Sequence, residues 1–295
     1  MAVARFFRLI RLTLWRALNH DAFGVAKGVA YSFIISLFPG FLLVASILAA
    51  SHKTAVFVRE IGYAVGRIMP PGAAQTAEAY FTSAQQRHIR VLVTTSIITL
   101  WTGSGVMISW MEGFRNAYQL PKTWGLVKER MIAFGLVIMA GIPLTFATVL
   151  VAFGNQIETW LVFRAGHELA PFILILWNMV RWLIAILTSI AVMLLIYHHA
   201  VPRTQPWHTV LPGATLATAV WFPATMAFGW YVGHFAQYSL LYGSLATAIV
   251  LLIWMYILSI IVLLGAEFNA LLFPRLVAAA HSSEFPVSRK IVAGS

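Results

Sequence analysis

The stretch that decides the fold runs from Tyr242 to Leu272 and reads YGSLATAIVLLIWMYILSIIVLLGAEFNALL. The 24 residues between Tyr242 and Glu267 contain no Asp, Glu, Lys, Arg or His. Because an α-helix rises about 1.5 Å per residue, this run is long enough to cross a hydrocarbon core about 30 Å thick. Glu267 and Asn269 follow at its end, where a carboxylate is costly unless it is paired or hydrated. The stretch therefore predicts a membrane-spanning helix that ends in a candidate polar site.

The composition of the whole chain is typical of an integral membrane protein. Of its 295 residues, 60% are apolar and 10% are charged, whereas soluble domains have about 25% charged residues. The absence of cysteine excludes disulfides and cysteine-ligated zinc. A net charge of +11 raises nucleic-acid binding as an alternative, but basic residues are common in cytoplasmic loops and face anionic lipid. We expect membrane lipids as partners and no nucleic acid.

Apolar runs of about 20 residues occur repeatedly along the chain and predict an all-α, polytopic helical bundle. The bundle occupies a membrane domain of residues 29–272. Its six predicted spans are residues 29–50, 91–111, 132–153, 172–197, 210–232 and 244–266.

The segments around these spans have their own patterns. Residues 1–28 contain a basic amphipathic stretch, Arg5–Leu18, that predicts a helix lying in the membrane interface. The long loop after the first span predicts two short amphipathic helices, Lys53–Met69 and Ala73–His88, and residues 273–295 form a polar tail. With the N-terminus inside, the inner segments hold 13 Lys and Arg and the outer loops hold six. This bias places both termini in the cytoplasm.

Arg181 is the one basic residue inside a predicted span, and Asn178 lies one turn before it on the same helix face. An intramembrane charge usually lines the interior of a bundle or a hydrated cavity, and it marks a functional site. Alternatively, Arg181 extends toward the outer surface beside Trp177 and Trp182, which would anchor the interface. The sequence leaves both interpretations open.

Further polar residues gather at the predicted cytoplasmic ends of the spans. An acid–base cluster there predicts a gate, a proton-coupled site or a headgroup site, but an ion-pair network that fixes helix ends would have the same composition. The members are Glu112, Arg115, Asn116, Arg130, Arg203, Glu267 and Asn269.

Helix-breaking residues at membrane depth favour a transport function. Pro39, Pro143 and Pro223 each fall within a predicted span, and broken helices often frame transport sites. Alternatively, these prolines have no functional meaning, because proline is frequent in membrane helices. Catalytic motifs are absent from the sequence: there is no HExxH, no GxSxG and no phosphate-binding loop, and Asp21 is the only Asp. We therefore predict no enzyme, no cofactor and no metal.

Short motifs in order along nearly the whole chain resemble those of the YihY/BrkB family of bacterial inner-membrane proteins. Tyr31, Ser36 and Pro39 occur in a stretch similar to that family's LAYxxLxSLxP signature. Gln119 departs from the family pattern, which has a basic residue nearby. The later motifs are Asn116-Ala117-Tyr118, Ala200-Val201-Pro202-Arg203, Pro212-Gly213-Ala214, Tyr242-Gly243-Ser244-Leu245 and Leu263-Leu264-Gly265-Ala266-Glu267.

The resemblance implies a multi-pass protein of the bacterial inner membrane whose motif residues are structural. It also implies an envelope-related function such as the movement of a lipid or an anionic solute. The family has carried the label ribonuclease BN, which the residues of this chain do not support. The main alternative is a non-catalytic membrane scaffold for envelope partners, and a membrane-bound nuclease or hydrolase is the less favoured one. The sequence leaves the oligomeric state open.

Overall fold

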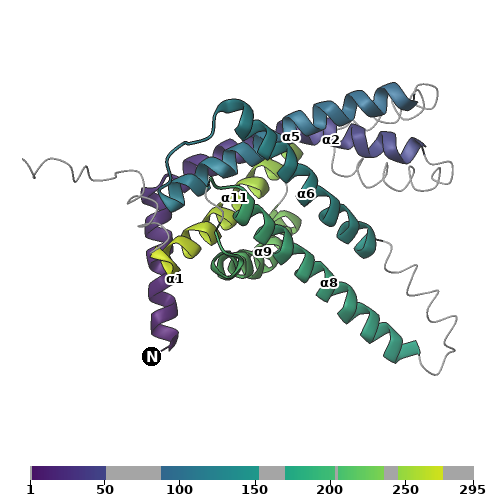
Figure 1. The fold of residues 1–295 in the computed structure, drawn as a ribbon. Coiled ribbons are helices and arrows are strands. Elements are labelled where there is room, and N and C mark those ends of the chain that lie inside the picture. The colour runs from purple at the N-terminus through teal and green to yellow at the C-terminus, as the bar shows by residue number, and fades with distance from the viewer. Residues whose placement is uncertain (1, 51–87, 153–169, 203–204, 236–244, 275–295) are drawn as a thin grey trace, which may run out of the picture.

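The computed structural model describes residues 2–50, 88–152, 170–202, 205–235 and 245–274, and the described secondary structure is helical throughout. Six of the described helices are long and apolar enough to cross a membrane, which confirms the predicted fold class (Figure 1). The helices are α1 (Ala2–Asn19), α2 (Ala22–Ala50), α5 (His88–Tyr118), α6 (Leu126–Ala152), α8 (Ala170–His199), α9 (Trp207–Phe235) and α11 (Leu245–Leu272).

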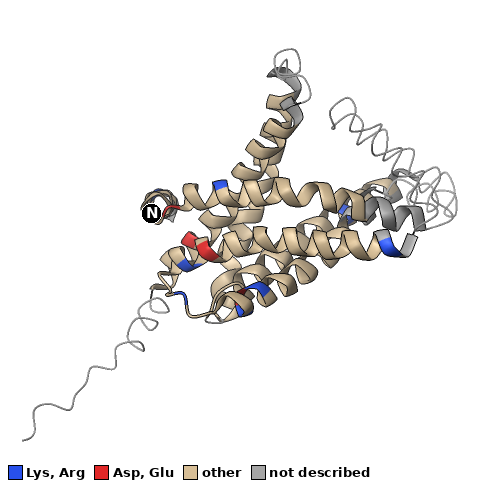
Figure 2. Ribbon diagram, turned by 90° about the horizontal axis from the view of Figure 1, so that it is seen from above, with Lys and Arg blue, Asp and Glu red and all other residues tan. Residues whose placement is uncertain are grey.

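Several helices extend beyond the predicted spans at the predicted cytoplasmic end. α2 begins at Ala22 rather than Val29, α5 continues to Tyr118, and α11 continues to Leu272. These extensions carry charged residues, which a search for apolar runs excludes. In Figure 2 the acidic residues of the described helices lie toward the end of the bundle near the N-terminus. The two short helices predicted for the first outer loop, and residues 275–295 of the predicted tail, lie outside the described residues.

A tight turn separates α1 from α2 and directs α1 across the end of the bundle (Figure 1). Asp21 has a φ of 54°, and its carbonyl oxygen accepts a hydrogen bond from the amide of Val25 at 3.0 Å. Its carboxylate lies over the first turn of α2, because a Cβ added to Gly24 would be 2.4 Å from the carboxylate oxygens. A negative charge there complements the positive end of the helix dipole.

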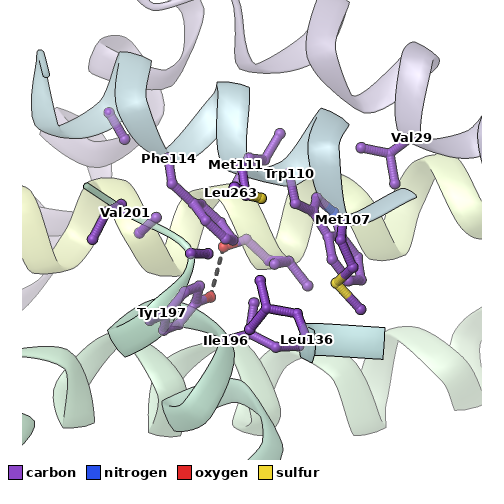
Figure 3. Close-up of a cluster of buried hydrophobic side chains, with 14 of the residues drawn as sticks. Val29, Met107, Trp110, Met111, Phe114, Leu136, Ile196, Tyr197, Val201 and Leu263 are labelled. Atoms are coloured by element: carbon purple, nitrogen blue, oxygen red, sulfur yellow. Dashed lines mark hydrogen bonds between the residues drawn. The ribbon is translucent and has the colours of Figure 1, made fainter. Parts of the chain in front are cut away.

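The core lies at the end of the bundle nearest α1. α11 is central and packs against α1, α2, α5 and α9, while α6 packs against α5 and α8. Figure 3 shows Phe114 of α5, Tyr197 of α8 and Leu263 of α11 converging there, and all three are buried. The rings of Phe114 and Tyr197 meet edge to face with centroids 5.2 Å apart. This packing fixes the predicted inner ends of α5, α8 and α11 relative to one another.

The prediction of helices broken at membrane depth is wrong for the three prolines. α2 continues through Pro39, α6 through Pro143 and α9 through Pro223. A proline removes one hydrogen bond from the helical ladder, and membrane helices tolerate this where neighbouring groups satisfy the freed carbonyl.

Candidate functional site

The backbones of α9 and α11 come into contact at two glycines. A Cβ added to Gly213 would lie 2.1 Å from the carbonyl oxygen of Gly265. A Cβ added to Gly265 would lie 2.3 Å from the hydroxyl oxygen of Tyr197. Small residues permit such close approach between membrane helices. No larger side chain fits between α9 and α11 at these two positions, and this close contact explains the two family-motif glycines.

Buried side chains fasten the neighbouring backbones at this contact. The Oδ1 atom of Asn269 accepts a hydrogen bond from the amide of Gly213 at 2.6 Å, and its Nδ2 donates to the carbonyl of Val210 at 3.1 Å. The hydroxyl of Tyr197 donates to the carbonyl of Val262 at 2.6 Å. Asn269 thus joins α11 to the beginning of α9, and Tyr197, which the sequence did not single out, joins α8 to α11.

Glu267 attaches α1 to the bundle. Its side chain is 1% exposed, and its Oε1 lies 2.6 Å from Nδ1 of His20. Its Oε2 lies 3.6 Å from Nε of Arg16. Both partners belong to α1 or to the turn that follows it. The carboxylate predicted to be paired or hydrated is therefore paired with the amphipathic helix.

Gln119 contacts the second ring nitrogen of His20, the one that does not face Glu267. Its Nε2 is 3.3 Å from Nε2 of His20, so His20 bridges α5 and α11. Gln119 has a φ of 54°, and α5 ends there in a Schellman motif: the amide of Leu120 bonds to the carbonyl of Arg115 at 2.8 Å, and that of Gln119 to the carbonyl of Asn116 at 3.1 Å. The departure from the family pattern therefore falls on a residue that contacts the α1 junction.

The prediction that Glu112 shares a cluster with Glu267 is wrong. Glu112 and Asn116 are exposed, and Glu112 has no ion pair within the described ranges. The physical reason is helical periodicity, because Glu112 and Asn116 lie one turn apart on the outer face of α5, whereas Phe114 and Arg115 are buried. Arg203 lies outside the described residues.

A second ion-pair group forms between α5 and α6, and its central residue was missed. Glu129 is 3% exposed; its Oε1 accepts a hydrogen bond from Nη1 of buried Arg115, and its Oε2 lies 3.4 Å from Nζ of Lys122. In the sequence, Glu129 stands between two basic residues, Lys128 and Arg130, directly before an apolar run, and this pattern indicates an acid at a helix end. The predicted third span begins after Glu129 and therefore does not include it.

Arg130 packs against α5 apart from that group. Its Nη1 donates to Oγ of Ser104 at 2.8 Å, and its Cζ lies 4.5 Å from the ring centroid of Trp101. A guanidinium over an indole face is a favourable cation–π contact. Arg115 and Arg130 are thus each bonded to separate groups rather than gathered around Glu267.

Arg181 has the predicted one-turn relation to Asn178. Its Nη2 donates to Oδ1 of Asn178 at 3.2 Å. The guanidinium is partly exposed within the span Leu174–His199. Large apolar side chains beside it, such as Met179 and Leu183, are exposed. A charge is therefore present in an apolar part of α8.

The remaining family-motif residues lie in several settings. Tyr31 is exposed on α2, where the hydroxyl of Ser36 donates to the carbonyl of Phe33 at 2.8 Å. Pro202 is half-buried after α8. Tyr242 and Gly243 lie outside the described residues.

The fold and the polar groups at its end define a polytopic α-helical membrane protein with an amphipathic N-terminal helix. The chain belongs to the virulence factor BrkB family, whose sequence model matches residues 13–286. This confirms the resemblance drawn from the short motifs. No solved structure matches the chain.

Curated relatives match most of the chain. The putative ribonuclease-like protein YfkH of Bacillus subtilis is 28% identical over 87% of this chain and 92% of its own length. A UPF0761 membrane protein of Tolumonas auensis is 27% identical over 88% of this chain and 83% of its own. Another of Stenotrophomonas maltophilia is 27% identical over 87% of this chain and 59% of its own. Two of these names state only a membrane protein, and the first includes a ribonuclease-like activity.

Proposed function

We propose that this protein moves an anionic lipid or an envelope-related anionic solute across the bacterial inner membrane. The observation that carries the proposal is Arg181, a partly exposed guanidinium inside an apolar span. Placing a charge at this depth is costly, and such residues commonly mark substrate pathways. The hydrogen bond that Arg181 donates to Asn178 orients the guanidinium, which suits recognition of a phosphate or carboxylate.

In this proposal the polar groups at the predicted inner end hold the fold in place. Glu129 binds Arg115, and Glu267 binds His20. Because each pair joins different segments of the chain, these contacts favour a structural clasp over a substrate site. The candidate substrate group is thereby reduced to Arg181 and Asn178.

The test is translocation in proteoliposomes, measured separately for a fluorescent phosphatidylglycerol and for an anionic solute. We expect Arg181→Ala to abolish movement of the substrate and Arg181→Lys to retain part of it. Arg90→Gln, which changes an exposed arginine at the start of α5, should behave as the wild type. Wild-type rates in folded Arg181→Ala would remove the site assignment.

We further propose that both termini face the cytoplasm. The support is the 13-to-six distribution of Lys and Arg between inner and outer segments. Fluorescent-protein and alkaline phosphatase fusions at Ser295 test it. Fluorescence without phosphatase activity is expected, and the reverse would invert the topology.

A scaffold for envelope partners is the second candidate. Its support is the set of large apolar side chains exposed on the described helices, including Tyr31, Ile97 and Phe146, because such faces contact either lipid or another protein. Cross-linking in the membrane to one defined envelope protein, together with no translocation in liposomes, would favour this function.

We do not propose a nuclease. A hydrolase needs a general acid or base that can reach its substrate, and the buried carboxylates Glu129 and Glu267 are engaged in ion pairs. RNA cleavage by the purified protein that disappears in Glu267→Gln would reverse this view.

A further inference from the structure

A groove lined almost entirely by carbon atoms lies between α1, α9 and α11 and encloses about 180 Å³. Its floor contains Ala217, Ile261 and Gly265, which are buried. Leu14 of α1 and Val220 of α9 line it as well and are exposed. The groove therefore opens to the surroundings of the bundle, beside the place where α1 crosses α9 and α11.

The groove offers no hydrogen-bond partner to a polar ligand. Its one polar side chain is Thr13, whose hydroxyl donates to the carbonyl of Leu9 within α1 at 2.9 Å. Apolar cavities of about 150 Å³ stay dry and accept apolar ligands. In a membrane protein the abundant apolar ligand is an acyl chain, so the groove fits a lipid tail.

Positive charge flanks the same part of α1. Arg8 and Arg11 are exposed and lie one turn apart, and Arg11 lies one turn before Leu14, which lines the groove. Within the described ranges, neither arginine has an ion pair. Arg16, by contrast, faces Glu267 at 3.6 Å. A guanidinium binds phosphate oxygens through charge-assisted hydrogen bonds, so this flank fits an anionic headgroup.

We propose that the groove binds an anionic phospholipid of the leaflet that α1 contacts. One acyl chain occupies the space between α1, α9 and α11, and the phosphate lies at Arg8 and Arg11. The bound lipid holds α1 against the bundle in addition to the contact of α1 with Glu267. This inference is independent of the proposed transport, because a lipid can be held here whether or not it is moved.

The test is lipid retention by the full-length protein in detergent, followed by native mass spectrometry with phosphatidylglycerol and phosphatidylcholine. We expect the wild type to prefer phosphatidylglycerol. Each arginine near an anionic group contributes about fivefold in affinity, so Arg8→Gln combined with Arg11→Gln should lower the preference by roughly tenfold or more. The exposed pair Lys27→Gln and Lys128→Gln removes equal charge elsewhere and should leave the preference unchanged.

A second pair of variants tests the groove itself. Val220→Trp places an indole at the groove and should reduce retention of both lipids, whereas Ala219→Trp, on the neighbouring exposed position, should not. Unchanged phosphatidylglycerol retention in the arginine double variant and in Val220→Trp would overturn the proposal. It would equally be overturned if Val220→Trp dissociated a dimer without changing lipid retention, because a second copy would then occupy the groove. Loss of translocation in Arg181→Ala with normal lipid retention would leave this proposal standing.

Discussion

Two regions of the molecule place polar side chains inside apolar helices, and they do so in different ways. At the end beside α1, Glu267 and Glu129 are 1% and 3% exposed, and each is bonded to side chains from outside its own helix. In α8, Arg181 is partly exposed and donates to Asn178 of the same helix. The comparison indicates that burial with partners from other segments supports the fold, and the proposed function assigns the partly exposed charge in the apolar span to a ligand.

The largest loss of stability is expected at the contact between α9 and α11, where there is no space for a side chain. Gly213→Leu would place its Cβ 2.1 Å from the carbonyl oxygen of Gly265, which requires α9 and α11 to separate. We expect a loss at or above about 4 kcal/mol and almost no monodisperse protein in detergent, measured by size-exclusion chromatography. Gly229→Ala on the same helix is the control, because its Cβ would meet nothing within 4 Å. Equal recovery of both variants would contradict the α9–α11 contact.

Removing the charge from Glu129 is expected to have the next largest effect. Glu129→Gln leaves buried Arg115 without its counter-charge, and breaking such a pair costs about 3–5 kcal/mol. The free energy of unfolding in mixed micelles measures it. Glu112→Gln is the matched change at an exposed acid and should stay within about 0.5 kcal/mol. If the two variants were equally stable, the Arg115–Glu129 pair would have no structural role.

A smaller effect is expected for the attachment of α1. Glu267→Ala removes the partner of Arg16 and His20, both of which keep some access to water, so we expect a loss of about 1–3 kcal/mol. Hydrogen exchange across Ala2–Asn19 should become faster, while exchange in α5 stays unchanged. Glu267→Gln, which keeps an acceptor for His20, should have less effect. Unaltered exchange in α1 would show that Glu267 does not hold it.

The smallest effect concerns the end of α5. Gln119 has a left-handed backbone conformation that glycine adopts readily, so Gln119→Gly removes backbone strain. The same substitution also removes the contact with His20. We expect a gain of about 1 kcal/mol or less, seen as a small rise in Tm. Asn116→Gly, inside the last turn of the same helix, should instead lower the stability by a few tenths of a kcal/mol. A fall in Tm for Gln119→Gly would mean that the contact between the Gln119 side-chain amide and His20 stabilises the fold by more than the backbone strain destabilises it.

Much of the fold could be predicted from hydropathy and helical periodicity. Each long apolar run became a helix, and Asn178 and Arg181, which the sequence places one turn apart on one helix face, are joined by a hydrogen bond. The amphipathic stretch Arg5–Leu18 likewise lies within α1. These predictions succeed because they depend on residues close together in sequence.

The partners at the predicted inner end could not be predicted in the same way. His20 and Glu267 are 247 positions apart, and they meet only because the turn at Asp21 sends α1 across α11. Glu129 was missed because its burial depends on α5, which supplies Arg115. The prediction for Glu112 was wrong because it used only the position of Glu112 along the axis of α5 and not the face of the helix on which Glu112 lies. Long-range packing decides the first two, and the helical periodicity of α5 decides the third.

Arg181→Gln, measured in one preparation for both Tm and substrate translocation in proteoliposomes, tests the contrast between the two regions most directly. The account predicts a Tm close to that of the wild type together with loss of translocation of the anionic substrate. A large fall in Tm with a normal rate per folded molecule would contradict it, because Arg181 would then belong with the structural ion pairs.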